Sequence, residues 1–187
     1  MKEINIYGRG GQGAVTAAQI LATAAFTQGY WPQTFPRFGG ERRGAPVVAY
    51  VRMDNEPIVI RTKVYAPDVV IVMDFNLFKM LNPLGDIKPD GTAIINYPDH
   101  GEGLPSSIIE RVGTLFTVDA TKIAHQIYGK TTIPITNVII LGAYCAAVKD
   151  ISMESIYKAL PDFFPEEKVE LNWKAAQMGY ENLRGLS

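Results

Sequence analysis

Cysteine and histidine are scarce in this chain. Its 187 residues include one cysteine, Cys145, and two histidines, His100 and His125. One thiol cannot form an intrachain disulfide or supply the cysteines of an iron-sulfur cluster or a zinc finger. Neither histidine has a second one near it at a spacing that would hold a metal. We therefore expect no metal site, and any redox centre that works with this chain must be held by another one.

Neither sign of charge is in excess, and long apolar runs are absent. Lys and Arg number 18 against 19 Asp and Glu, a formal net charge of −1. This balance gives no general attraction for nucleic acid or an anionic membrane, so an anion site has to be local. No stretch has the roughly 18 consecutive apolar residues of a transmembrane helix, and the start lacks a signal-peptide pattern. We expect a soluble, cytoplasmic protein with neither kind of partner.

What is present favours the α/β class. A length of 187 residues with 47% hydrophobic composition is enough for one sizeable core. We expect a single domain over 1–187, because no repeat or linker divides the chain. Stretches typical of strands alternate with stretches at helical spacing. This alternation predicts a three-layer α/β/α, Rossmann-like domain with a largely parallel sheet.

The expected elements follow one another closely. Buried strands are predicted at 4–6, 47–53, 68–73, 92–96 and 114–118, with a further extended stretch at 30–35. Helices are predicted at 14–28, 77–81, 119–128, 136–148, 152–160 and 165–183. Residues 36–46 are expected to form a loop, and 58–61 to pair back on 47–53 as the second strand of a hairpin.

The most informative motif is a glycine run between the first strand and the first helix. The string GRGGQG has the spacing G-x-G-x-x-G, and its residues are Gly8, Arg9, Gly10, Gly11, Gln12 and Gly13. The first glycine permits a tight turn, the second lets backbone N–H groups approach a pyrophosphate, and the third lets the helix pack on the strand. A helix N-terminus adds about half a positive charge. The motif favours a nucleotide or phosphate ligand, with a purely structural turn as the alternative.

NAD is disfavoured as that ligand. An NAD site needs an Asp or Glu about 20 residues beyond the glycines, to bind the ribose hydroxyls. The stretch 28–40 contains no acid, and the nearest one, Glu41, lies between glycine and arginine.

A second cluster, RFGGERRG at 37–44, is rich in arginine and glycine and includes Arg42, Arg43 and Gly44. The planar guanidinium makes bidentate hydrogen bonds to phosphate or carboxylate. We expect an exposed loop whose arginines contact a ligand or another subunit. The alternative is a solvated loop whose arginines pair with Glu41 or with acids of a neighbouring chain. Together, the two clusters predict a phosphorylated nucleotide.

Three stretches give the chain a specific resemblance to a known family. GRGGQGAVTAA at 8–18, FPRFGGERRGAPV at 35–47 and NVIILGA at 137–143 resemble the gamma subunit of 2-oxoacid:ferredoxin oxidoreductases of the pyruvate synthase type. Residues 163–165 and 172–180 resemble the closing helices of that family, so the resemblance covers nearly the whole chain. The form ERRGAP is more similar to the pyruvate and branched-chain 2-oxoacid branch than to the 2-oxoglutarate branch.

This resemblance implies the fold of the coenzyme A-associated domain of pyruvate:ferredoxin oxidoreductase. It implies a place in an enzyme that oxidatively decarboxylates a 2-oxoacid, passes electrons to ferredoxin and transfers the acyl group to coenzyme A. Thiamine diphosphate and the 4Fe-4S clusters are then expected in partner alpha, beta and ferredoxin-like delta subunits. This chain would hold no catalytic residue and would be inactive alone.

The ligand that the resemblance implies is coenzyme A, which carries a pyrophosphate and a ribose phosphate. Gly8 to Gly13 would approach the pyrophosphate. Arg42, Arg43 and Gly44 would meet phosphate or help to close the site.

Four other polar residues have a structural interpretation beside a functional one. Cys145 lies in an apolar helical stretch, so we expect a buried, inert thiol. Asp74 and Asp119 follow strands, where the ligand crevice of such a sheet opens, but capping of the next helix is favoured for both. Asn137 either contacts a partner or caps its helix, and the sequence leaves both open.

Two other functions stay open from the sequence. The chain could be a purely structural assembly subunit, with glycines that only pack a strand against its helix. It could also be an independent dinucleotide-binding reductase, which the missing ribose-binding acid disfavours.

Overall fold

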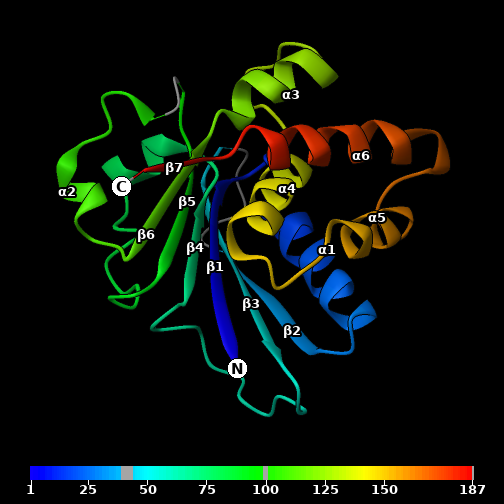
Figure 1. Cartoon of the computed structure of the whole chain (residues 1–187), viewed down its shortest axis with the longest axis horizontal. Helices are drawn as coiled ribbons and strands as arrows, with labels where there is room; N and C mark the ends of the chain where they lie inside the picture. The colour runs from blue at the N-terminus through cyan, green and yellow to red at the C-terminus, as the bar shows by residue number, and fades with distance from the viewer. Residues whose placement is uncertain (39–43, 99–100, 187) are drawn as a thin grey trace.

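The computed structural model describes residues 1–38, 44–98 and 101–186, and its centre is one seven-stranded sheet with the order β2-β3-β1-β4-β5-β6-β7 (Figure 1). The strands are β1 (Lys2–Arg9), β2 (Trp31–Phe38), β3 (Pro46–Asp54), β4 (Val69–Val72), β5 (Thr92–Asn96), β6 (Thr114–Val118) and β7 (Arg184–Leu186). The α-helices are α1 (Ala14–Thr27), α2 (Ser106–Ile109), α3 (Ala120–Tyr128), α4 (Asn137–Val148), α5 (Met153–Ala159) and α6 (Glu166–Glu181). The short 3-10 helices in the described part of the chain include η1 (Phe75–Lys79) and η3 (Leu160–Asp162).

The middle of the sheet is parallel and both edges are antiparallel. β1, β4, β5 and β6 pair in parallel, in that order. β3 runs antiparallel to both β1 and β2, and β7 runs antiparallel to β6. The expected α/β fold with a largely parallel sheet is therefore confirmed, with β3 and β7 as the strands that run the opposite way.

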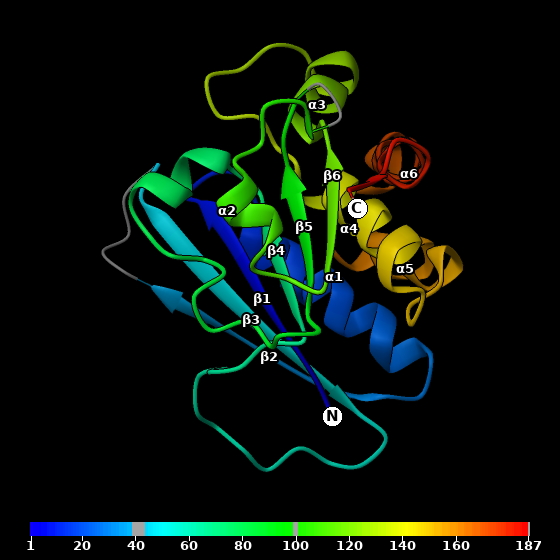
Figure 2. The same ribbon diagram turned by 60° about the vertical axis from the view of Figure 1, so that its left-hand side comes forward.

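Helices cover the two faces of the sheet unequally. α1, α4, α5 and α6 lie on one face, while η1 and α2 lie on the other (Figures 1 and 2). Alternate residues of β4 divide between the faces: Val69 and Ile71 join the core under the large helices, and Val70 and Val72 join the core under η1 and α2. Because both faces are covered, β4 is apolar throughout, as its sequence predicted.

On the thick face, helices α4 and α6 touch backbone to backbone. A Cβ atom on Gly142 of α4 would overlap the carbonyl oxygen of Ala176, and one on Gly179 of α6 would overlap that of Ile139. Glycine at these two positions therefore lets α6 lie directly on α4, which in turn packs between α6 and the sheet.

The helix starts agree with the sequence because their caps are local. The side chains of Asp74, Asp119 and Ser152 accept hydrogen bonds from the N–H groups of Asn76, Lys122 and Ser155. The segment expected as a helix at 77–81 is instead the 3-10 helix η1, shifted toward its cap. Pro83 follows closely and disfavours helical backbone at Asn82, which leaves little room for an α-helix.

Two sequence predictions about the edge of the sheet are wrong. The expected loop at 36–46 is shorter, because β2 continues to Phe38 and β3 begins at Pro46. The expected strand at 58–61 does not form, and residues 59–61 are exposed, with Val59 at 85%. Just beyond this segment, the side chain of Arg52, which is 2% exposed, donates to the carbonyl oxygen of Lys63. Strand β7 and helix α2 had no prediction.

Among the described residues, none of the helices combines the length and the apolar character needed to cross a membrane.

Candidate functional site

The glycine run forms the end of β1 and the turn into α1. Gly8 and Arg9 belong to the strand and pair with Val47 and Pro46 of β3, so the turn itself is confined to residues 10–13. Gly11 and Gly13 have φ angles of 101° and 84°, in the region that glycine adopts without strain. Gly13 is the N-cap residue of α1, and no side-chain hydrogen bond caps this helix. The start of α1 therefore offers backbone N–H groups.

Two of the glycines are also required by close packing. A Cβ on Gly8 would lie 2.8 Å from the Cβ of Ala14, and a Cβ on Gly13 would lie 2.7 Å from Nδ2 of Asn137. Asn137 is 3% exposed, and its Oδ1 accepts a hydrogen bond from the N–H of Val138. In the described chain Asn137 thus packs on the glycine turn, a role that the sequence interpretation of this residue had not included.

The glycine turn and the second cluster meet at Gly44. The N–H of Gly44 donates to the carbonyl oxygen of Gly10, and the N–H of Gly10 donates to that of Ala45, both at 2.9 Å. Nε of Arg9 donates to the carbonyl oxygen of Gly44, also at 2.9 Å. Arg42 and Arg43, the cationic members of the predicted site, lie outside the described residues.

Gln12 fixes the shape of the turn. It is 2% exposed, and its Oε1 accepts a hydrogen bond from the N–H of Arg9 at 2.8 Å. Its Nε2 donates to Oδ2 of Asp74 at 3.4 Å. Both polar ends of the side chain are used within the protein, so Gln12 orders the turn more than it offers hydrogen bonds to a ligand.

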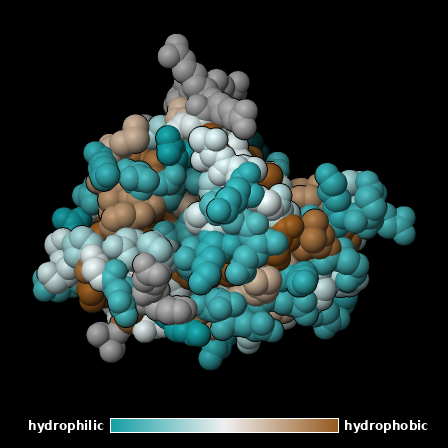
Figure 3. All heavy atoms as spheres, turned by 90° about the horizontal axis from the view of Figure 1, so that it is seen from above, coloured by the Kyte–Doolittle hydropathy of each residue, from teal (hydrophilic) through white to brown (hydrophobic). Residues whose placement is uncertain are grey.

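A cleft of about 750 Å³ opens beside the glycine turn. It lies beyond the carboxyl ends of the parallel strands, where sheets of this kind bind ligands. Figure 3 looks onto this side of the molecule, and hydrophilic residues cover much of it. The cleft is lined by Arg9, Gln12, Met73, Asp74, Phe75, Asn76, Asn96, Pro98, Asp119, Thr121, Lys122, His125, Gln126, Lys130, Thr132 and Pro134.

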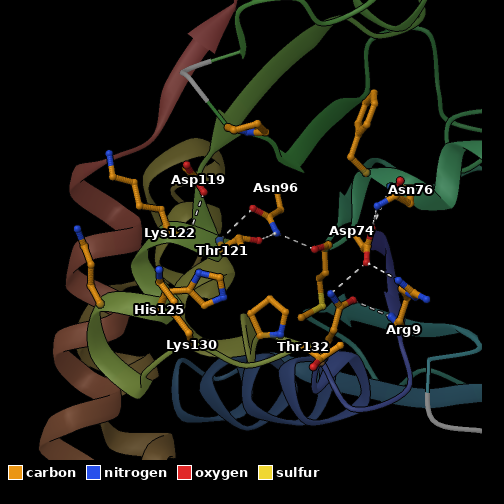
Figure 4. Close-up of a pocket in the computed structure, with 16 residues that line it drawn as sticks. Arg9, Asp74, Asn76, Asn96, Asp119, Thr121, Lys122, His125, Lys130 and Thr132 are labelled. Carbon is orange, nitrogen blue, oxygen red and sulfur yellow. Dashed lines mark hydrogen bonds and ion pairs between the residues drawn. The ribbon is translucent and has the colours of Figure 1, made fainter.

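Asp74 both caps a helix and faces the cleft. Its Oδ1 accepts from the N–H of Asn76 at 2.9 Å, while its Oδ2 accepts from the guanidinium of Arg9 at 3.4 Å (Figure 4). Asp119 likewise caps α3 through the N–H of Lys122 at 2.8 Å. The sequence posed capping and a place in the crevice as alternatives for these two residues, and the structure combines them.

Asn96, at the end of β5, links the end of β4 to the start of α3 by hydrogen bonds at the base of the cleft. From the sequence, no role was predicted for this residue. Its Nδ2 donates to the carbonyl oxygen of Met73 at 2.8 Å and to Oγ1 of Thr121 at 2.9 Å. Its Oδ1 accepts from the N–H of Thr121 at 3.2 Å. The sequence feature that could have indicated this role is a polar amide side chain directly after the apolar residues 93–95.

Basic side chains lie on the other side of the cleft from Arg9 and Asp74. They are Lys122 and His125 of α3 and Lys130 just after it (Figure 4). Nε2 of His125 is buried and has no hydrogen-bond partner among the described residues. These three residues were not among the predicted site residues, because they lie about 110 residues beyond the glycines in the sequence.

The single thiol is far less acidic than usual. Cys145 is 3% exposed, and burial raises its pKa to about 12, with a further contribution from the charge of Asp150. This agrees with the expectation of a buried, inert cysteine. Within the described chain, no group of three or more His, Cys, Asp or Glu side chains could hold a metal ion.

Residues 3–182 match the family model described as pyruvate ferredoxin/flavodoxin oxidoreductase. The chain belongs to this family. It is 46% identical over 181 residues to the pyruvate/ketoisovalerate oxidoreductases common subunit gamma of Pyrococcus furiosus, with 97% of this chain and 96% of that protein covered. It is 48% identical over 160 residues to the pyruvate synthase subunit PorC of Methanosarcina barkeri, covering 86% of this chain and 85% of that one.

Solved structures show the same fold. The pyruvate oxidoreductase subunit PORC of Thermotoga maritima superposes with a TM-score of 0.81 at 33% identity, covering 100% of this chain and 98% of that one. A 2-oxoglutarate:ferredoxin oxidoreductase of Magnetococcus marinus gives 0.78 at 23% identity over 96% of this chain and 30% of the longer one. The resemblance to the gamma subunit is thus confirmed, and the chain is a subunit of an oxidoreductase complex of the pyruvate/ketoisovalerate type.

Proposed function

We propose that this subunit binds coenzyme A for a complex that oxidises pyruvate or a branched-chain 2-oxoacid to acyl-CoA and passes the electrons to ferredoxin. One observation carries the proposal. The glycine turn and Gly44, from the two motifs suited to phosphate, are hydrogen-bonded to each other beside a cleft at the carboxyl ends of parallel strands. A helix N-terminus without a side-chain cap is a ready site for an anion.

Each motif has a role in this proposal. Residues 8–13 bring the N–H groups at the start of α1 to the pyrophosphate, since glycine leaves the approach free of side chains. Gly44 holds the second motif against that turn, and Arg42 and Arg43 supply positive charge to phosphate. Arg9 contributes less charge, because its guanidinium is already bonded to Asp74 and Gly44.

The rest of the chemistry is assigned to partners. With one cysteine, this chain cannot hold a 4Fe-4S cluster. We place the clusters and thiamine diphosphate in alpha, beta and delta subunits, with the 187 residues acting as one domain of a cytoplasmic complex. In support, the 2-oxoglutarate enzyme with the same fold has 2-oxoglutarate, coenzyme A and succinyl-CoA bound.

The topology argues against an NAD site of the usual kind. In the dinucleotide-binding fold, the strand that carries the ribose-binding acid lies next to the first strand. Here β3 lies between β1 and β2. An acid at the end of β2 would stand two strands away from the glycines, about 10 Å at the usual strand spacing.

A purely structural role for the glycines is the second candidate, and the packing of Gly8 and Gly13 favours it. The contacts with Ala14 and Asn137 would require glycine even without a ligand. The two candidates differ in whether the chain changes the affinity of the complex for coenzyme A.

The test measures coenzyme A binding to the assembled complex by equilibrium dialysis, together with steady-state kinetics. We expect Arg43→Ala to weaken coenzyme A binding about ten- to a hundredfold, as for the loss of a charge-assisted hydrogen bond, and to leave the KM of the 2-oxoacid unchanged. Arg42→Ala should act in the same direction. Arg61→Ala is the matched control, because the segment after β3 lies at the opposite end of the sheet (Figure 2). Unchanged coenzyme A affinity in both cluster variants would favour the structural role.

A further inference from the structure

The basic residues on the far side of the cleft carry charge that the described protein leaves uncompensated. Lys122 and Lys130 form no ion pair with any described residue. Lys122 and His125 are three residues apart on α3 and therefore share a helix face. All three line the cleft, and the buried Nε2 of His125 lacks a hydrogen-bond partner in the described chain. We call Lys122, His125 and Lys130 the α3 cluster.

The glycine side of the cleft is different in charge. Arg9 is the cation there, and its guanidinium lies 3.4 Å from the Asp74 carboxylate. The two formal charges offset each other, so this side attracts an anion mainly through backbone N–H groups at the start of α1. An elongated ligand with two kinds of phosphate would therefore find two chemically distinct anion sites, the α3 cluster within the cleft and the start of α1 beside it.

Two carboxylates limit where an anion can lie between these sites. Asp74 borders the glycine side, and Asp119 caps α3 at the base of the α3 cluster. Neither forms an ion pair with a lysine of the cluster among the described residues. Pro98 also lines the cleft, and its neighbours Asp99 and His100 lie outside the described residues. Because a carboxylate repels a phosphate, a bound phosphate would contact the lysine and histidine side chains of the α3 cluster and stay away from Asp119.

We propose that the α3 cluster binds the 3′-phosphate of coenzyme A, while the glycine turn takes the pyrophosphate. This rests on the proposed function and adds an orientation of the ligand in the cleft. A phosphate monoester such as the 3′-phosphate carries a charge of about −1.5 to −2 at pH 7. Each phosphate group of the pyrophosphate carries less negative charge. Lysine ammonium groups on flexible stems suit such a compact dianion, whereas backbone N–H groups suit the less charged pyrophosphate.

The cluster consequently makes the complex distinguish coenzyme A from 3′-dephospho-coenzyme A, which has the same pyrophosphate and thiol arm. Coenzyme A binds more tightly because only its 3′-phosphate provides a partner for the unpaired ammonium groups of Lys122 and Lys130. It would be absent if the cleft recognised the pyrophosphate alone.

The experiment measures binding of both ligands to the assembled complex by equilibrium dialysis, with no turnover required. For the wild type we expect 3′-dephospho-coenzyme A to bind about ten- to a hundredfold more weakly than coenzyme A. In Lys122→Gln/Lys130→Gln, affinity for coenzyme A should fall by that factor and affinity for the dephospho ligand should stay unchanged. Lys149→Gln is the matched control, since Lys149 follows the far end of α4, away from the glycine turn. Gel filtration verifies that each variant complex assembles.

The outcomes separate this inference from the proposed function. Equal wild-type affinity for the two ligands overturns the 3′-phosphate site and leaves coenzyme A binding intact. A double variant that weakens both ligands alike, retains the wild-type preference or fails to assemble also overturns it. If Arg42→Ala, Arg43→Ala and the Lys122→Gln/Lys130→Gln double variant all leave coenzyme A affinity unchanged, the proposed function itself fails.

Discussion

At the scale of single residues, Cys145 shows how burial decides the chemistry of a side chain. The thiol sits on α4, a helix with buried residues around its whole circumference over 137–145. Desolvation disfavours the thiolate and raises the pKa of Cys145 to about 12 from an ordinary 9.0. The neutral thiol therefore acts as a small apolar group of the core and not as a nucleophile.

This pKa predicts how stability changes at alkaline pH. Because the folded chain holds the proton more tightly than the unfolded chain, the stabilisation is complete below about pH 9 and is lost as pH rises toward 12. The slope for one such group is about 1.4 kcal/mol per pH unit. Urea denaturation between about pH 8 and 10 should thus show a steeper loss in the wild type than in Cys145→Ala.

Tyr128 provides an internal check on that experiment. Burial raises its pKa to about 12 from 10.0, so its contribution to the alkaline loss starts at higher pH and remains in Cys145→Ala. Parallel stability curves for the wild type and the variant between about pH 8 and 10 would contradict the buried, protonated state of Cys145.

At the scale of elements, two glycines at helix ends have nearly the same φ angle but different surroundings. Gly13 has φ 84° and packs against Asn137, whereas Gly29, which follows α1, has φ 88° and open space where a Cβ would stand. At both positions, a residue with a side chain would have to adopt the unfavourable left-handed backbone conformation. Only Gly13 adds a steric cost.

We expect Gly29→Ala to lower the free energy of unfolding by about 1–2 kcal/mol, the cost of left-handed backbone for an L-residue. Gly13→Ala should cost a further 1–3 kcal/mol or so, because the new methyl group meets Asn137. Combining Gly13→Ala with Asn137→Ala should recover much of that excess relative to Asn137→Ala alone. Urea denaturation of the four variants measures this, and equal losses for the two glycine variants would show that the turn tolerates a side chain.

The elements that the sequence predicted well are those whose ends are decided locally. Asp119 and Ser152 each cap the following helix through an N–H group three residues away, and Gly29 ends α1. The two errors at the edge of the sheet concern strands. The β-branched stretch at 58–61 has strand propensity but no strand beside it, while 36–38 pair with β3 despite Pro36. Strand formation depends on a partner strand that can lie anywhere in the chain, and propensity does not supply one.

At the scale of the whole molecule, the cleft is assembled from residues that are far apart in sequence. Arg9 ends β1, Asp74 follows β4, Asn96 ends β5, and Asp119 follows β6. Parallel pairing brings these strand ends to one edge of the sheet, and α3 closes the far side. The chain thus offers a binding surface, while its sequence has no cysteine set for the electron-transfer centres of an oxidoreductase.

This division of labour predicts that the purified chain alone forms no acyl-CoA from pyruvate and coenzyme A with an added electron acceptor. Activity should appear only when the partner subunits are supplied, and it should rise with the amount of this chain up to saturation. The assay follows reduction of the acceptor and acyl-CoA formation together. Turnover by the isolated chain would contradict its role as one subunit of a complex.

The sequence by itself determined the α/β class, the glycine turn, the helix caps and the family, because these depend on residues close together along the chain. Tertiary structure alone decided that Gly44 meets Gly10, that β3 separates β1 from β2, and that Lys122 and Lys130 face Arg9 and Asp74 across a cleft. The physical reason is the strand order of the sheet. It places distant segments at one edge, and no local propensity encodes that order.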